Sequence, residues 1–231
     1  MTVLSAIQDV CAVLPLTRPE AVFSSTEREH FELQALANAA ARHIARDCEW
    51  QELKAVATVT GDGETEAFDF PADHDRMLTR AELRRSRDGM PLVHVLSSDR
   101  WLGMTIGGRG AAAGAWTVYG GRIHVRPAPA AGEEIAWFYM SSKWALDVNG
   151  TPRLAFASDT DGFRLPEELL GLCMIWKWRA AKGLAYAEDL AGYEEAREKL
   201  MVADRGPRIL TLGRARIAGG AAAAWPGVIL P

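Results

Sequence analysis

The spacing of apolar residues changes period twice along the chain, from helical to alternating and back. At residues 3–14 and again from about residue 26 to residue 50, apolar side chains recur every three or four positions, which is the period of an amphipathic helix, and a loop with two prolines separates the two segments. From residue 54 to residue 141 short segments alternate apolar and polar residues, as strands do. The helical period returns between residues 165 and 205. This order predicts an α+β fold, with a helical bundle formed by both chain ends and an inserted antiparallel β-domain.

Three regions follow from this pattern. We expect a helical bundle from residues 1–53 and 164–205, and an antiparallel β-domain with loops over residues 54–163. Residues 206–231 form the third region, which we expect to be an extended C-terminal arm. The arm contains three arginines, no acidic residue and a Gly/Ala-rich stretch, a composition that builds no core of its own.

Local signals mark the ends of the predicted helices. Thr2 is placed to cap the first helix. Thr26 and Glu29 have the spacing of a capping box at the start of the second helix. Pro166 fits the first turn of a third helix, and Gly183 fits its C-terminal cap. A fourth helix is expected from about residue 186 to residue 205.

Glycines indicate the turns of the middle region. Gly61-Asp62-Gly63 stands between two short strand patterns, residues 54–60 and 65–70, and predicts a hairpin. Gly120-Gly121 predicts a second hairpin with a two-residue turn. Further strands are expected at residues 90–96 and 134–141, and a glycine- and alanine-rich loop at residues 103–114.

Composition and charge exclude several classes of protein. The net charge of −4 argues against a general DNA-binding surface, because phosphate neutralisation requires a basic excess. Cys11, Cys48 and Cys173 are far apart and odd in number, so we expect neither a disulfide framework nor a zinc site. The first residues lack the basic segment of a signal peptide, and the longest apolar run is too short to span a bilayer. We therefore expect assembly in a cytoplasm.

Candidate catalytic and ligand-binding motifs are weak. Asp73-His74-Asp75 and Asp159-Thr160-Asp161 contain metal-ligating residue types, but neither has the spacing of a known metal site. The glycine-rich segment at residues 107–110 lacks the Lys-Ser/Thr ending of a phosphate-binding loop, and the five histidines have no nucleophile motif. Arg84, Arg85 and Arg87 are balanced by neighbouring acids, which favours a solvated loop or strand edge. We expect no catalytic residue, metal or cofactor.

In their order along the chain, several segments resemble the head-to-tail adaptor proteins of tailed bacteriophages, which are also called connector or tail accessory proteins. The resemblance covers about residues 1–205. The segments that carry it are Leu4–Cys11, Leu36–Leu53, Phe70–Arg76, Pro127–Glu133, Phe156–Asp161, Leu165–Leu170 and Trp176–Leu184.

This resemblance implies a structural virion protein without enzymatic activity. It implies a homo-oligomeric, dodecameric ring at the head–tail interface that connects the capsid portal to the tail and lines the DNA exit channel. Its partners would be the portal, neighbouring copies and a downstream tail or stopper protein. DNA would pass without sequence-specific binding, and no membrane is involved.

Two sets of residues are candidates for these contacts. Eight tryptophans are many for this length, and tryptophan is both a core and an interface residue. We expect portal binding at Arg208, Arg214, Arg216, Trp225, Ile229 and Leu230, and subunit contacts at Trp50, Trp176, Trp178 and Tyr186. An assembly chaperone or scaffold, and a virion-associated hydrolase that acts on cell wall or nucleic acid, are the alternative functions.

Overall fold

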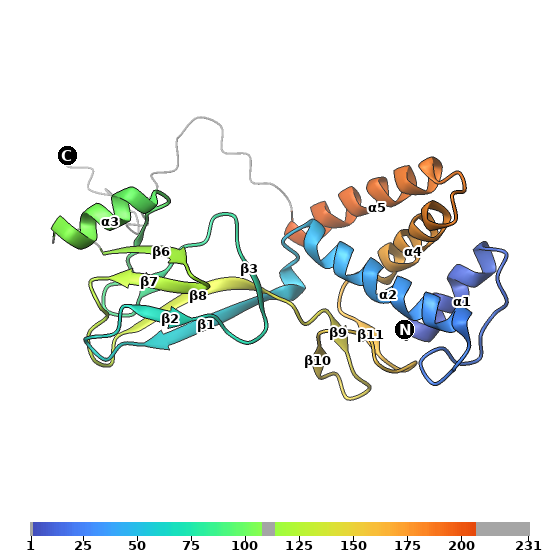
Figure 1. Cartoon of the computed structure of the whole chain (residues 1–231), viewed down its shortest axis with the longest axis horizontal. Coiled ribbons are helices and arrows are strands. Elements are labelled where there is room, and N and C mark those ends of the chain that lie inside the picture. The colour runs from blue at the N-terminus through green and yellow to red at the C-terminus, as the bar shows by residue number, and fades with distance from the viewer. Residues whose placement is uncertain (1, 108–113, 207–231) are drawn as a thin grey trace, which may run out of the picture. The chain divides into compact units, whose positions relative to one another are not determined.

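The structure is a computed structural model that describes residues 2–107 and 114–206. The described residues divide into two units. The helical unit comprises residues 2–55, 73–76 and 140–206, and the β unit comprises residues 56–72, 77–107 and 114–139. Helices from both chain ends pack together, and the middle of the sequence forms strands, so the predicted α+β class is confirmed (Figure 1). The sequence placed the second boundary at residue 163, whereas this division groups residues 140–163 with the helices.

Helix α4 is the centre of the helical unit. It packs against α1, α2 and α5 (Figure 1). A helix surrounded in this way is apolar on several sides, and α4 buries Leu169, Leu170, Cys173, Met174 and Ile175. The helices of this unit are α1 (Val3–Val13), α2 (Arg28–Asp47), α4 (Glu167–Ala181) and α5 (Ala187–Arg205), with a 3-10 turn at Gln51–Leu53.

The expected cap at Thr2 is confirmed. Its hydroxyl accepts the Ser5 backbone N–H at 3.3 Å, and the Thr2 N–H donates to the Ser5 hydroxyl at 3.1 Å. The C-terminal cap of α4 at Gly183 is also confirmed. Gly183 adopts a φ of +69°, and the next N–H, from Leu184, donates to the Arg179 carbonyl at 2.9 Å.

The capping box expected at Thr26 and Glu29 does not form. Helix α2 begins one residue later than the box requires, with Glu27 as its N-cap and no side-chain bond to the first turn. The Ser25 hydroxyl instead accepts the Glu27 backbone N–H at 3.2 Å and lies 2.6 Å from His30 Nδ1. Ser25 thus bonds the residue that precedes the first turn, and no side chain caps the helix.

A small three-stranded sheet accompanies the helices. It consists of β9 (Ala145–Leu146), β10 (Pro152–Arg153) and β11 (Gly162–Phe163), in the order β10-β9-β11. The loop before β11 is fixed by two carboxylates. Asp159 accepts the backbone N–H groups of Val22 and Phe23 at 2.8 and 3.1 Å, and Asp161 accepts those of Ala157 and Ser158 at 2.6 and 2.9 Å. These bonds give both aspartates a structural role.

The hairpin at Gly120-Gly121 is present as predicted. It joins β6 (Ala115–Tyr119) to β7 (Arg122–Arg126), and both glycines have positive φ, as a type I′ turn requires. The sheet around it has the order β2-β7-β6-β5. Its outer strands are β2 (Ala67–Asp69) and β5 (Val93–His94), and β5 runs parallel to β6.

The prediction of a hairpin at Gly61-Asp62-Gly63 is wrong. Strand β1 (Lys54–Thr60) belongs to a sheet of order β1-β8-β3, whereas β2 pairs with β7 in the other sheet. Distant hydrogen bonds determine this arrangement, because the Gly61 N–H donates to the Glu133 carbonyl at 2.7 Å. The remaining strands are β3 (His74–Met77), β4 (Arg84–Arg85), which pairs with β8, and β8 (Glu134–Ser141).

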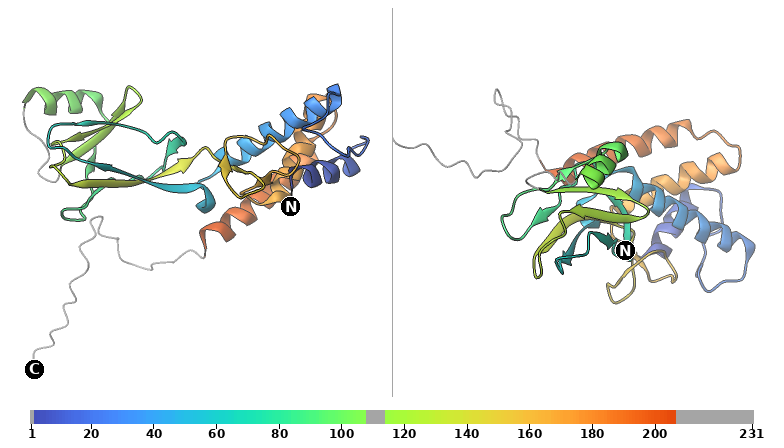
Figure 2. Two further views of the ribbon diagram at one scale, coloured as in Figure 1. Left: turned by 90° about the horizontal axis from the view of Figure 1, so that it is seen from below. Right: turned by 60° about the vertical axis from the view of Figure 1, so that its left-hand side comes forward.

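Part of the loop expected at residues 103–114 is helical. Helix α3 (Ser98–Gly107) lies beside the β6–β7 hairpin (Figure 2). Its buried Trp101 packs with Val95 and Ala115, and the Arg126 guanidinium lies 5.2 Å from the centre of its ring. This burial explains a helix through glycine-rich sequence. Residues 108–113 of the expected loop lie outside the described residues.

The cysteines and most tryptophans belong to the core. Cys11, Cys48 and Cys173 are buried free thiols, as the sequence indicated. None of the helices in residues 2–107 and 114–206 combines the length and apolar character that a bilayer span requires. The buried tryptophans are Trp50, Trp101, Trp116, Trp137 and Trp144.

Candidate protein-binding surfaces

The residues expected to contact a portal all lie outside the described residues. They follow Gly206, the last residue that the structure describes. The residues concerned are Arg208, Arg214, Arg216, Trp225, Ile229 and Leu230.

The expected interface residue Trp50 lies in the core of its own chain. It is 0% exposed and donates its indole N–H to the Ile44 carbonyl at 2.8 Å. Its ring and its polar atom are both inaccessible to a partner. Its hydrogen bond to Ile44 stabilises the C-terminal end of α2. Any interface of this unit must therefore use other side chains.

Trp176 and Tyr186 lie together at the junction of α4 and α5. Their ring centres are 6.5 Å apart, and the ring of Tyr193 on α5 lies 6.3 Å from that of Trp176. His43 of α2 meets the edge of Trp176 at 5.8 Å. Tyr186 is 41% exposed, so this cluster is accessible at one end and buried at the other. The cluster first of all holds α5 against its neighbours.

A carboxylate completes that junction. Asp47, the last residue of α2, accepts a hydrogen bond from the Tyr193 hydroxyl at 2.6 Å. Arg197 and His43 lie 3.5 and 3.7 Å from the same carboxylate oxygen. Burial, followed by the hydrogen bond to Asp47, raises the pKa of Tyr193, and burial lowers the pKa of His43 despite Asp47. Asp47 was not identified from the sequence. The four-residue spacing of His43 and Asp47, which places them on one face of α2, could have indicated that the two side chains interact.

Trp178 faces a different part of the surface. It lines a hollow of about 350 Å³ together with Leu33 of α2 and the preceding loop. Lys182 lies 5.9 Å from the centre of the Trp178 ring and pairs with Glu32 at 2.9 Å. The structure therefore brings Trp176 and Tyr186 together but leaves Trp178 at a separate place.

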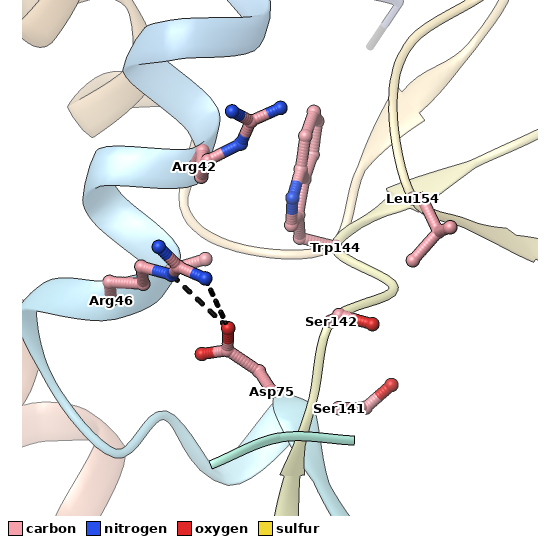
Figure 3. A pocket seen from close by; sticks show the side chains of 8 residues that line it. Arg42, Arg46, Asp75, Ser141, Ser142, Trp144 and Leu154 are labelled. Atoms are coloured by element: carbon pink, nitrogen blue, oxygen red, sulfur yellow. Dashed lines mark hydrogen bonds and ion pairs between the residues drawn. The ribbon is translucent and has the colours of Figure 1, made fainter. Parts of the chain in front are cut away.

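A second hollow, of about 240 Å³, lies beside the C-terminal half of α2 (Figure 3). Arg46 donates to Asp75 Oδ1 at 2.7 and 3.1 Å, and Arg76 donates to Asp75 Oδ2 at 2.7 Å. Burial alone would raise the pKa of Asp75, but these two guanidinium groups hold it below its usual value. The opposite wall contains Ser141, Ser142, Trp144 and Leu154.

Arg42 is a charged side chain of this hollow that has no ion-pair partner within the described chain. Its side chain points toward the hollow beside Trp144 (Figure 3), and within the described chain it has no ion pair or hydrogen bond. The nearest carboxylate of the hollow, Asp75, is already shared by two other arginines. Leu154 on the rim is 58% exposed. The hollow thus presents a free cation next to an exposed apolar side chain.

Helix α5 has an unpartnered outer surface. Along α5, all of which the structure describes, Tyr193 is the only buried residue. Near its end a hollow of about 400 Å³ is lined by Glu198, Met201, Val202, Arg205 and Gly206. Val202 is 68% exposed, and Glu198 has no ion pair or hydrogen bond within the described chain.

The β unit has its own exposed apolar surface. A hollow of about 310 Å³ is lined by Leu96, Trp116 and His94, among others. Leu96 is 85% exposed, and His94 stacks on Trp116 with ring centres 3.9 Å apart. On α3, Ile106 is 79% exposed. Of these two exposed side chains, Leu96 lines the hollow, which makes the hollow a candidate surface for a protein contact.

The weak chemical motifs have structural partners. Asp73 accepts the Ser141 hydroxyl at 2.7 Å, and Asp75 is held by two arginines as described above. Among the described residues, no group of three or more His, Cys, Asp or Glu side chains is arranged to hold a metal. In the basic segment, Arg84 is exposed at β4 and pairs with Glu82, but Arg85 is 6% exposed and is therefore not part of a solvated edge.

No curated protein matches this chain. The family model described as SU10 adaptor protein matches residues 1–217, a range that includes both units and agrees with the resemblance drawn from the sequence. Membership in this family implies a structural role in a phage particle. The chain belongs to the SU10 adaptor protein family, a phage adaptor family.

Proposed function

We propose that this chain is the subunit of a closed ring that joins the capsid portal of a phage to its tail. The match of residues 1–217 to the SU10 adaptor protein family carries this proposal. The ring lies at the head–tail interface of the virion, lines the channel through which DNA leaves, and is assembled in the host cytoplasm. The face of the ring opposite the portal binds the next tail or stopper protein.

The surfaces described above support a role in protein contacts. Closed rings use heterologous interfaces, in which one face of a subunit meets a different face of its neighbour. The helical unit offers different hollows beside α2 and on α5, and the β unit offers the apolar surface around Leu96. The net charge of −4 suits a channel that lets DNA slide without sequence-specific binding.

Residues 206–231 are the proposed portal anchor. Their three arginines and absence of acids suit an acidic surface on the portal. Trp225, Ile229 and Leu230 supply large apolar side chains, which carry most of the binding energy in such contacts. An extended chain of this length reaches roughly 80 Å. Many arms on one ring bind far more tightly than a single arm does.

Mass measurement under native conditions tests the proposal. We expect the chain to form a ring with a fixed number of copies on purified portal, and to be largely unassembled without it. If the chain never joins portal as a multiple of copies, the ring proposal is wrong. A chain that binds portal transiently and is absent from finished particles would indicate an assembly chaperone instead.

A truncation tests the anchor separately. Deletion of residues 207–231 is expected to weaken portal binding by at least about tenfold, because the charged and apolar anchors are lost together. The matched controls change Arg208, Arg214 and Arg216 all to Lys, which keeps the charge, or all to Gln, which removes it. If the truncated chain joins portal as tightly as the full chain, the anchor lies elsewhere in the molecule.

A further inference from the structure

Two hollows of the helical unit have complementary contents. The hollow beside α2 contains the free cation of Arg42 and, on its rim, the projecting side chain of Leu154, which is 58% exposed. The hollow on α5 contains the free carboxylate of Glu198 and the apolar side chains of Met201 and Val202. The α5 hollow is also lined by Arg205, and the α2 hollow by Asp75, which is already paired with Arg46 and Arg76. The free cation Arg42 on one side and the free carboxylate Glu198 on the other each lie next to apolar groups.

On each side, a free charged group and an apolar side chain line the same hollow. Arg42 and Leu154 both line the hollow of about 240 Å³. Glu198 and Val202 are four residues apart on α5, which places them on the same helix face one turn apart. A helix that presents Glu198 to Arg42 thus brings Val202 and Met201 close to Leu154.

One copy does not bring these two surfaces together within itself. Helices α2 and α5 both pack on α4 (Figure 1) and meet each other at Asp47 and Tyr193, whereas Arg42 and Glu198 line different hollows. Arg42 and Glu198 both remain without an ion pair in the described chain. Two complementary surfaces at different places on one chain are what a heterologous contact between identical copies requires.

We infer that Glu198 of one copy pairs with Arg42 of the next, while Leu154 of that next copy inserts between Met201 and Val202. This inference rests on the proposed ring and names its subunit contact. Exposed ion pairs are weak, but association excludes water from this one and places apolar contacts beside it. A second copy is favoured over another partner because this chain supplies both halves of the match.

Charge reversal tests the ion pair. We expect Arg42→Glu and Glu198→Arg each to weaken ring formation on portal by about tenfold, because each places like charges across the contact. The double variant restores the pair in reverse and should recover to within about threefold of the original chain. Arg80→Glu and Glu64→Arg, at exposed positions of the β unit, are the matched controls with equal changes in charge and no expected effect.

Cysteine cross-linking tests the apolar half. The native cysteines are buried, so a chain with Leu154→Cys and Val202→Cys presents two new accessible thiols. On assembled rings, mild oxidation is expected to link neighbouring copies into a ladder of covalent multimers, whereas either single substitution gives no ladder. Rings that form but give no ladder would overturn this half of the contact.

The outcomes separate this inference from the ring itself. If the unaltered chain forms no ring on portal, the proposed function fails. If the unaltered chain forms rings and both charge-reversed single variants do so equally well, the function stands and the inferred contact is wrong. If the single variants fail and the double variant, with an unchanged melting temperature, fails as well, the pairing of these two residues is wrong.

Discussion

Helices α4 and α5 follow one another along the chain but are built for different surroundings. Helix α4 packs against three other helices and includes Leu169, Cys173 and Met174, each 0% exposed. Helix α5 packs on α4 and buries Tyr193 as the only buried residue along its fully described length. The first helix therefore holds the bundle together, and the second adds surface to it.

This difference shows where binding residues are free to occur. Because burial of apolar area is the main stabilising contribution to folding, substitutions in α4 act on the core. Most positions of α5 carry no such constraint, so its charged side chains can serve a partner. Four variants test how far this contrast between the two helices holds.

Truncation of the core methionine of α4 should have the largest effect. Met174→Ala removes a side chain that is 0% exposed and leaves a cavity, so we expect a loss of about 2–5 kcal/mol in the free energy of unfolding. Denaturant unfolding measures this loss. The matched control is Met201→Ala on α5, whose half-buried side chain should cost less than about 1 kcal/mol. Equal losses at the two positions would show that α5 is as much a part of the core as α4.

Removal of one hydroxyl should loosen α5 alone. Tyr193→Phe deletes the hydrogen bond to the Asp47 carboxylate, at a cost of about 1–3 kcal/mol, because the carboxylate loses its short hydrogen bond and keeps only the longer contacts to Arg197 and His43. Hydrogen exchange should increase mainly in α5. Tyr186→Phe is the control, since Tyr186 is 41% exposed and its hydroxyl makes no hydrogen bond within the described chain. Unchanged exchange in α5 would show that its attachment depends on ring packing instead.

The junction of the helices should also respond to pH. Burial lowers the pKa of His43 below its usual 6.5, so the unfolded chain binds this proton more readily than the folded chain. Stability is therefore present above about pH 6.5 and is lost as the pH falls below it. Between about pH 7.5 and about pH 5.5, His43→Gln should lose less stability than the original chain. An identical loss in both would assign the pH dependence to other groups.

Locally determined features of the fold were predictable from the sequence. The turn at Gly120-Gly121 and the cap at Gly183 depend on positive φ at glycine, which adjacent residues already indicate. The turn at Gly61 was misread, because its partner is the carbonyl of Glu133, far away in the sequence. Helix α3 was missed because the burial of Trp101 depends on its packing with Val95 and with Ala115 of β6, which the local residue pattern does not reveal.

The candidate surfaces were less predictable than the fold. Tryptophan type alone did not distinguish the buried Trp50 from the accessible Trp178, because both fit a core and an interface. Arg42 was not identified from the sequence. Arg42 is left without an ion pair because Arg46, one turn later on the same helix face, pairs with Asp75 instead, and sequence alone does not show which of the two arginines does so. The only local signal was a pair of arginines four residues apart on an alanine-rich helix.

The smallest effect is expected at an ion pair on the exterior of α5. Lys199 and Glu195 lie 2.6 Å apart, one helical turn from each other, and their side chains are 73% and 69% exposed. The pair raises the pKa of Lys199 and lowers that of Glu195, but water and salt screen such a contact almost completely. Lys199→Ala should therefore leave the melting temperature unchanged, as should Glu195→Ala as the reciprocal control. A drop as large as that caused by Tyr193→Phe would mean that surface charges, rather than the Tyr193 junction, hold α5 in place.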